Sequence, residues 1–137
     1  MRVALSLALA ALSSPAFADE MWSSSYGPVI WETDLGTTAV LLLQDTDSGV
    51  GIRLLVPGLA ADMSGGRGTY TGVWVSTEGE QPCVSEMVDP VGGYTSPYWG
   101  TFTLTFVHDS FPSDWAGAFG ACLDLRTVPF SGTVQTG

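Results

Sequence analysis

The chain has 137 residues, with 14 acidic and four basic side chains and a formal net charge of −10. This charge balance excludes nucleic-acid binding, because phosphate recognition depends on clustered Lys and Arg side chains. The same deficit of basic residues excludes tight adhesion to an anionic membrane surface.

The N-terminal residues have the layout of a cleavable secretory signal peptide. Arg2 precedes an apolar run over residues 3–12, and an Ala-Phe-Ala triplet ends at Ala18. The run is shorter than the roughly 18 to 20 apolar residues that span a bilayer, and no second run follows. We therefore predict cleavage after Ala18, one domain over residues 19–137, no transmembrane segment, and a periplasmic or secreted location.

The first predicted elements are two strands over residues 38–44 and 51–56. Both runs are rich in β-forming apolar side chains, and the segment 45–49 between them consists of turn formers. Together they predict a β-hairpin. The turn begins like a calcium-binding loop, but Val50 and Val56 stand where an EF-hand needs a glycine and a carboxylate, so we expect no metal site.

Two further strands are predicted in the middle of the chain. Residues 69–76 form a β-rich run in which Gly72 indicates a β-bulge or a close approach of another backbone. Residues 83–88 predict a shorter strand that ends in a turn rich in Gly and Pro. The segment from Tyr98 onward is expected to return antiparallel to that short strand.

The clearest strand signal covers residues 101–108, where Thr alternates with Phe and Leu in the pattern of a half-buried antiparallel strand. Residues 113–119 predict one helical turn at most, since a glycine within them weakens the helix. Residues 123–128 and 130–134 predict two more short strands, with Pro129 at an edge or a bend between them.

The fold class that follows is all-β: a small antiparallel β-barrel or β-sandwich of about six to eight strands with at most one short helical turn. Both architectures produce the same strand pattern. Cys83 and Cys122 remain after signal cleavage and reach an oxidising compartment, so we predict that they form one disulfide bond. The bond would join the two halves of the fold.

No catalytic residue is predicted, and we do not expect an enzyme. The one histidine, His108, precedes Asp109 and Ser110, but neighbours on a strand point to opposite faces and cannot converge as a triad does. The motifs of nucleophilic hydrolases are missing, and a single histidine with paired cysteines cannot form a zinc site. No metal or other cofactor is expected. The abundant carboxylates leave a small carboxylate-dependent hydrolase as one alternative.

Aromatic side chains near loops are candidates for a binding surface. Tyr94, Tyr98 and Trp99 flank a turn rich in Gly and Pro, and Trp22 and Tyr26 lie in a polar N-terminal segment. Aromatic residues combine a large contact area with a polar group, and binding surfaces use both. The alternative is that these rings cover the ends of the barrel or sandwich.

A glycine-rich loop supplies the remaining binding candidates, Ser64, Arg67 and Tyr70. Arg67 is expected to pair with a nearby carboxylate. The segment 64–70 resembles the Ser-Gly-x-x-Tyr stretch of the bacterial periplasmic inhibitors of C-type lysozyme, which are small exported β-barrels with a disulfide. This resemblance implies that Ser64 and Tyr70 enter the cleft of the enzyme, while the negative net charge attracts a cationic lysozyme.

These features predict a non-catalytic binding module that acts through a surface or a pocket. In one version, exposed loops bind or inhibit a cationic protein such as lysozyme. In the other, a lipocalin-like carrier holds a small apolar ligand inside a closed barrel. The sequence does not say which protein or small ligand is the partner.

Overall fold

A computed structural model describes residues 20–62, 68–109 and 111–135 of the chain. The predicted signal peptide lies outside these residues, and so do Ser64 and Arg67. Within the described residues, no helix has the length and apolar character that a membrane crossing requires.

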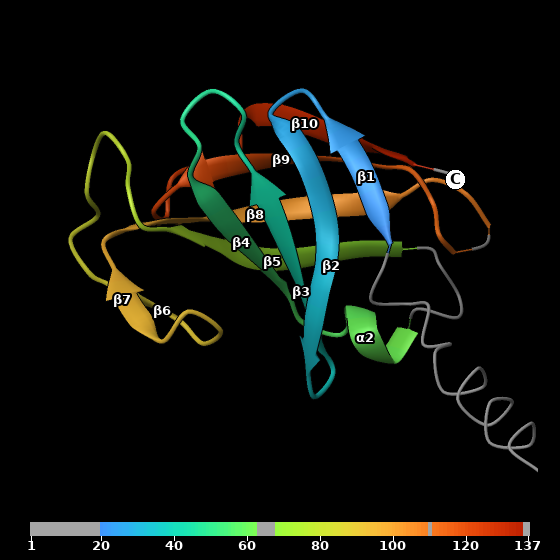
Figure 1. Ribbon diagram of the computed structural model, residues 1–137, viewed down its shortest axis with the longest axis horizontal. Helices are drawn as coiled ribbons and strands as arrows, with labels where there is room; N and C mark the ends of the chain where they lie inside the picture. The colour runs from blue at the N-terminus through green and yellow to red at the C-terminus, as the bar shows by residue number, and fades with distance from the viewer. Residues whose placement is uncertain (1–19, 63–67, 110, 136–137) are drawn as a thin grey trace, which may run out of the picture.

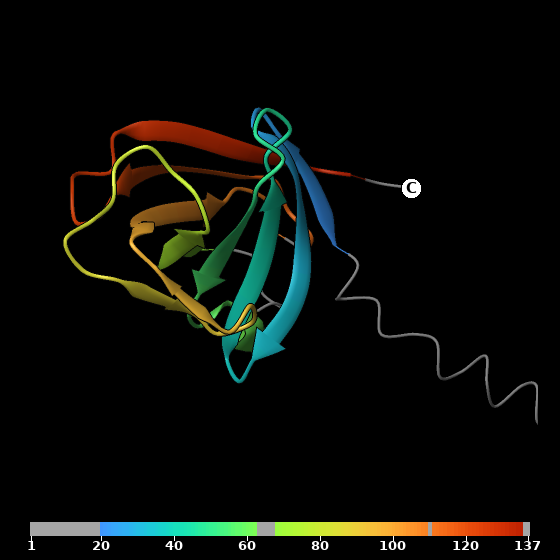
Figure 2. The ribbon, with the colours of Figure 1, turned by 60° about the vertical axis from the view of Figure 1, so that its left-hand side comes forward.

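Eight strands form a closed antiparallel β-barrel (Figures 1 and 2). The strands that follow one another in the chain pair side by side, except that β5 pairs with β8, and β10 closes the ring against β1. The barrel strands are β1 (Met21–Ser24), β2 (Gly27–Leu35), β3 (Thr38–Gln44), β4 (Gly51–Val56), β5 (Gly68–Ser76), β8 (Tyr98–Phe106), β9 (Trp115–Ala121) and β10 (Val128–Val134). This architecture confirms the all-β prediction and decides between its two alternatives in favour of the barrel.

A short hairpin lies outside the barrel, between β5 and β8 in the chain (Figure 1). Its strands, β6 (Met87–Asp89) and β7 (Tyr94–Ser96), form a separate two-stranded sheet. The prediction of a strand over 83–88 that pairs with the segment from Tyr98 was wrong in its extent and its partner. The Asp89 carboxylate accepts hydrogen bonds from the N–H groups of Val91 and Gly92 and so reverses the chain before Tyr98 is reached.

The alternation of side chains along the strands fills the barrel interior. On β3, Leu41 and Leu43 are buried, and on β8, Phe102, Leu104 and Phe106 are buried. The threonines between the three β8 residues are more exposed than these neighbours. Because successive side chains of a strand point to opposite faces, one face of each strand faces the core.

One end of the barrel is closed by the β4–β5 and β8–β9 connections. The first contains the helix α2 (Leu59–Asp62), whose Leu59 is fully buried. The N–H groups of Gly58 and Ala60 both bond to the carbonyl oxygen of Thr37, so the β4–β5 connection lies against the β2–β3 turn (Figure 1). The second connection inserts Phe111, whose ring makes edge contacts with Trp22 and Trp31. These apolar contacts exclude water from this end of the barrel.

The N-terminal strands β1 and β2 were not predicted from the sequence. Trp22 is fully buried, and its indole N–H donates a 2.8 Å hydrogen bond to the carbonyl oxygen of Ser113. The pairs Trp22–Val134 and Ser23–Thr133 join β1 to β10 and close the ring. Polar residues in a segment this short obscure the alternation that would have indicated a strand.

The residues predicted as a helical turn, 113–119, mostly belong to strand β9, and the short helix occurs at α2 instead. In β9 three small residues separate Trp115 from Phe119 and leave room for the close pairing with β8. The strand therefore results from the pairing of neighbouring strands, which overrides a weak local preference for helix.

The C-terminal prediction of two strands separated by Pro129 is replaced by the single strand β10. Pro129 pairs with Ala118 of β9. The contact of β10 with β1 is limited to Thr133 and Val134, so β10 is an edge at Pro129. A proline fits there because no neighbour requires its missing N–H.

The close backbone approach predicted at Gly72 is confirmed. The pairing of β5 with β8 continues in register across Gly72, so there is no bulge at this position. A β-carbon at Gly72 would lie 2.1 Å from the Leu55 carbonyl oxygen and 2.6 Å from the Phe102 ring.

We expect Gly72→Ala to lower the free energy of unfolding by about 2 kcal/mol, because the added methyl group forces strand and ring apart. Chemical denaturation measures this change. Thr71→Ala is the matched control, since Thr71 is exposed on the same strand and should change stability by about 0.5 kcal/mol or less. Equal effects of the two substitutions would contradict the close approach.

Candidate functional site

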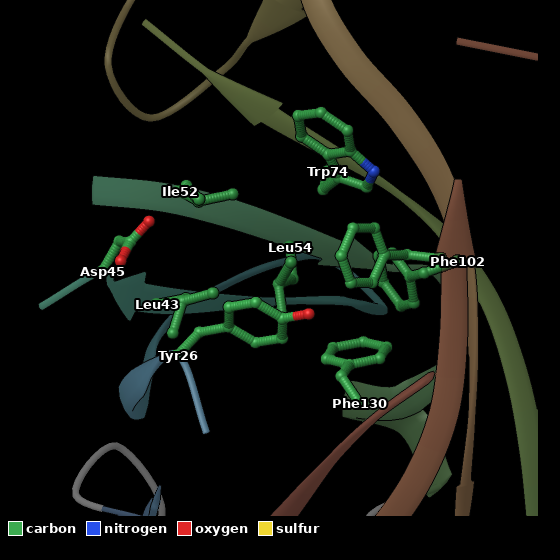
Figure 3. A pocket seen from close by; sticks show the side chains of 9 residues that line it. Tyr26, Leu43, Asp45, Ile52, Leu54, Trp74, Phe102 and Phe130 are labelled. Atoms are coloured by element: carbon green, nitrogen blue, oxygen red, sulfur yellow. The ribbon is translucent and has the colours of Figure 1, made fainter. Parts of the chain in front are cut away.

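A cavity of about 220 Å³ lies inside the barrel at the end opposite α2. Figure 3 shows the side chains that line it. It is found where β3 ends and β4 begins, next to the last residues of β5 and β9. Its lining is formed by Tyr26, Leu43, Asp45, Ile52, Leu54, Trp74, Phe102, Phe119 and Phe130. The open end of the barrel therefore contains an apolar pocket with aromatic walls.

Phe119 organises the aromatic walls of the cavity. Its ring makes edge contacts with Tyr26, Trp74 and Phe130, with centroid separations of 5.9, 6.4 and 5.3 Å. Edge contacts of this kind stabilise aromatic pairs beyond the area that they bury. The walls belong to a connected cluster of rings, so we expect the cavity to keep its shape when empty.

Few polar groups belong to the residues that line the cavity. The Trp74 indole N–H donates a 2.9 Å hydrogen bond to the carbonyl oxygen of Gly120 and is occupied within the barrel wall. The Tyr26 hydroxyl points into the cavity (Figure 3) and forms no hydrogen bond with any residue that the structure describes. The Asp45 carboxylate lies at the edge of the cavity beside Ile52. A ligand would thus meet one hydroxyl and one carboxylate.

The turn that holds Asp45 is a tight connection between β3 and β4. The Asp45 N–H donates to the carbonyl oxygen of Val50, and the Gly49 N–H donates to that of Asp45. One oxygen of the Asp45 side chain accepts the N–H of Asp47 at 3.0 Å. Among the described residues, no group of three or more His, Cys, Asp or Glu side chains could hold a metal ion.

The predicted disulfide is confirmed and lies at the open end of the barrel. Cys83, in the connection between β5 and β6, is bonded to Cys122, directly after β9. Backbone hydrogen bonds from Cys83 to Pro97 and from Cys122 to Trp99, both 2.7 Å, hold the two cysteines beside the start of β8. A disulfide is typical of proteins that work in oxidising compartments.

An ion-pair network fixes the outer hairpin to the barrel. Arg53 of β4 makes two hydrogen bonds to Glu32 of β2, at 2.8 and 2.9 Å, and a third of 2.9 Å to Asp89 of β6. The side chain of Asp89 is fully buried, and burial alone would favour its neutral form. Hydrogen bonds from the N–H of Gly92, from Arg53 and from the Tyr94 hydroxyl outweigh burial and lower the pKa of Asp89.

The aromatic candidates Tyr94, Tyr98 and Trp99 all take part in the structure between β5 and β8. The Tyr94 hydroxyl donates a hydrogen bond to the Asp89 carboxylate. Burial is the main cause that raises the pKa of the Tyr94 hydroxyl, and this hydrogen bond is the second. The Tyr98 ring lies against Gly79. Trp99 is only 5% exposed and donates its indole N–H to the carbonyl oxygen of Ser85. These three residues hold the long connection in place, and none of them lines the cavity.

Tyr70 and His108 lie away from the cavity. The Tyr70 ring is half-buried and packs against Phe106, near the closed end. His108 is exposed beyond the end of β8, and its Nε2 lies 3.3 Å from the Asp114 carboxylate. The hydrogen bond from the N–H of Val134 is the main interaction that lowers the pKa of Asp114, and the contact with His108 lowers it further.

Sequence reasoning did not single out most of the residues that line the cavity. Phe102 was recognised as an inward-facing residue of a strand, and Tyr26 and Trp74 were recognised only as aromatic residues. Phe119 was assigned to a helical turn, and Phe130 to a short terminal strand. Trp115 and Phe119 share one face of β9, but the three small residues between them hide the period of two, so the local sequence does not indicate a strand here.

The fold and the cavity define a closed antiparallel β-barrel with an apolar interior site that opens at one end. Comparisons of the chain with protein-family models, with curated proteins and with solved structures find no match.

Proposed function

We propose that this protein is an exported, non-catalytic carrier that binds a small, mostly apolar ligand in the open end of its barrel. The observation that carries the proposal is the aromatic cavity at one end of a barrel whose other end is filled by Leu59 and Phe111. Eight-stranded barrels have an interior just large enough for one small ligand. The apparent secretory signal and the disulfide support a periplasmic or extracellular location.

The size of the cavity limits the ligand to about one ring. An apolar protein cavity of roughly 150 Å³ accepts benzene. The cavity here, at about 220 Å³, has room for one aromatic ring with a short substituent. Drug-sized ligands occupy pockets of roughly 300 Å³ or more, so a larger ligand would protrude from the mouth.

The cavity favours binding over hydrolysis. A carboxylate-dependent hydrolase uses a pair of carboxyl groups on either side of the bond that it breaks. Asp45 is the one carboxylate among the residues that line this cavity. Inhibition of lysozyme stays a prediction, because Ser64 and Arg67 lie outside the described residues.

Native mass spectrometry of protein isolated from its own host tests the proposal. We expect a discrete small mass on the folded protein that is lost on denaturation. We also expect p-fluorotoluene, followed by fluorine NMR, to bind the emptied protein. Ile52→Trp should abolish both signals, since the larger side chain fills the cavity from its edge.

Thr71→Trp is the matched control for Ile52→Trp, because it introduces the same side chain at an exposed position of β5. This variant should bind like the wild type. The carrier proposal fails if the protein carries no small molecule and p-fluorotoluene does not bind, or if both variants bind equally well.

A further inference from the structure

We infer that the ligand of this cavity is an organic cation: an aromatic or similarly compact apolar group that carries a protonated or quaternary amine toward the mouth. The inference rests on the proposed function and specifies its ligand class. It is drawn from the aromatic walls, the position of Asp45 and the charges of the loops that surround the opening.

The aromatic walls suit a positive charge as well as an apolar group. Five of the residues that line the cavity are aromatic: Tyr26, Trp74, Phe102, Phe119 and Phe130. Figure 3 shows Trp74 and Tyr26 on opposite sides of the space, with Phe102 and Phe130 at its inner end. The face of an aromatic ring is negative and attracts cations, most strongly for Trp. Ammonium groups are commonly bound in enclosures of this kind.

Asp45 places a formal negative charge at the edge of the same space. Its side chain is half-buried, and among the described residues it accepts one hydrogen bond, from the N–H of Asp47. No Arg, Lys or His among the described residues forms an ion pair with this carboxylate. An ammonium group at the mouth would therefore find an unneutralised carboxylate next to aromatic rings, whereas an anion would be repelled.

The connections around the opening reinforce this preference. Among the described residues, the β3–β4 connection, the start of the β5–β6 connection and the β9–β10 connection carry five carboxylates against the single guanidinium of Arg126; the five are Asp45, Asp47, Glu78, Glu80 and Asp124. Arg126 donates a hydrogen bond to Thr101 on the barrel wall. The rim is therefore strongly negative, which raises the local concentration of cations and slows the approach of anions.

Three probes of similar size separate charge from shape: p-fluorobenzylammonium, p-fluorotoluene and p-fluorobenzoate, each titrated by fluorine NMR at low ionic strength. We expect the cation to bind about tenfold more tightly than the neutral probe, since cation–π and carboxylate attraction add to the same apolar contact. The anion should bind more weakly than either. Added salt should reduce the advantage of the cation, because the mouth is open to solvent.

Asp45→Asn tests the role of the carboxylate. The amide oxygen of Asn can still accept the N–H of Asp47, so the turn is preserved. The ratio of the affinities for p-fluorobenzylammonium and p-fluorotoluene should fall severalfold. Asp47→Asn is the control, since it removes a charge from the same turn at an exposed position that does not line the cavity.

The outcomes distinguish this inference from the function on which it rests. If the three probes bind with equal affinity, or if Asp47→Asn reduces the cation's advantage as much as Asp45→Asn does, the aromatic cavity and its Asp45 carboxylate do not select the ligand, and the inference falls while the carrier function stands. If none of the probes binds, the inference is overturned, and if the protein isolated from its host also carries no small molecule, the carrier function is overturned with it.

Discussion

Reduction of the Cys83–Cys122 disulfide is expected to lower the melting temperature by roughly 10 °C or more. The bond closes a loop with a sequence separation of 39. In the chain-entropy model a loop of this length contributes about 4 kcal/mol of stability, because it restricts the unfolded chain. For a domain of this size, each kcal/mol shifts the melting temperature by roughly 2 to 8 °C.

The β circular dichroism should survive reduction at room temperature. The disulfide lies at one end of the barrel, and backbone pairing holds all eight strands together without it. The Cys83→Ser/Cys122→Ser double variant should melt like the reduced wild type and should not respond to reductant. An unchanged melting curve after mass spectrometry has verified reduction would show that the bond does not stabilise the fold.

Arg53→Met is expected to lower the free energy of unfolding by about 3 kcal/mol. The substitution removes the cationic partner of Asp89, whose side chain has no exposure to solvent. Loss of one member of a buried ion pair costs roughly 3 to 5 kcal/mol, and the lower value is expected here because Arg53 is one-fifth exposed. Urea denaturation monitored by tryptophan fluorescence measures the change.

Two further variants separate the buried charge from the loss of the Arg53 side chain. Glu32→Gln should cost about 1 kcal/mol or less, because the Glu32 side chain is 24% exposed and its loss leaves Asp89 paired. Adding Asp89→Asn to Arg53→Met should restore part of the lost stability, since the buried group is then neutral. If the double variant is no more stable than Arg53→Met, the cost does not arise from the unpaired carboxylate.

The effect of Arg53→Met should also depend on pH. The pKa of Asp89 is lowered in the folded protein, so its carboxylate contributes stability above its unfolded pKa of about 4 and loses that contribution as the pH falls through the folded pKa. Without Arg53, the folded pKa of Asp89 rises. The difference in stability between wild type and variant should therefore be largest near neutral pH and should narrow below about pH 4.

The disulfide and the Arg53 network act on the same long connection between β5 and β8. The disulfide ties its first part to the end of β9, and Arg53 ties the β6–β7 hairpin to β4 and β2. Trp99 adds a hydrogen bond to Ser85 between these two points. These contacts explain why a connection of this length stays ordered beside the opening of the cavity.

The local features of the sequence determined much of the secondary structure. The 38–44 and 51–56 strands and the turn between them lie in the barrel as expected. The strand predicted over 101–108 is β8, which begins earlier, at Tyr98, and ends at Phe106. Gly72 marked a close approach, and two cysteines in a chain with a predicted signal peptide indicated one disulfide. Each of these inferences depends on residues that are neighbours in the chain or on composition alone.

Only the tertiary structure decided that the strands close into a barrel and that the barrel contains a cavity. Alternation shows which side chains share a face of a strand, but it does not say which strands are adjacent or how far the sheet curves. Closure depends on the pairing of Trp22 with Val134, two residues that are far apart in the sequence. The cavity walls come from six strands and two turns. The sequence therefore determined an acidic, disulfide-linked β protein, whereas long-range pairing placed Tyr26, Asp45 and Phe130 around one space.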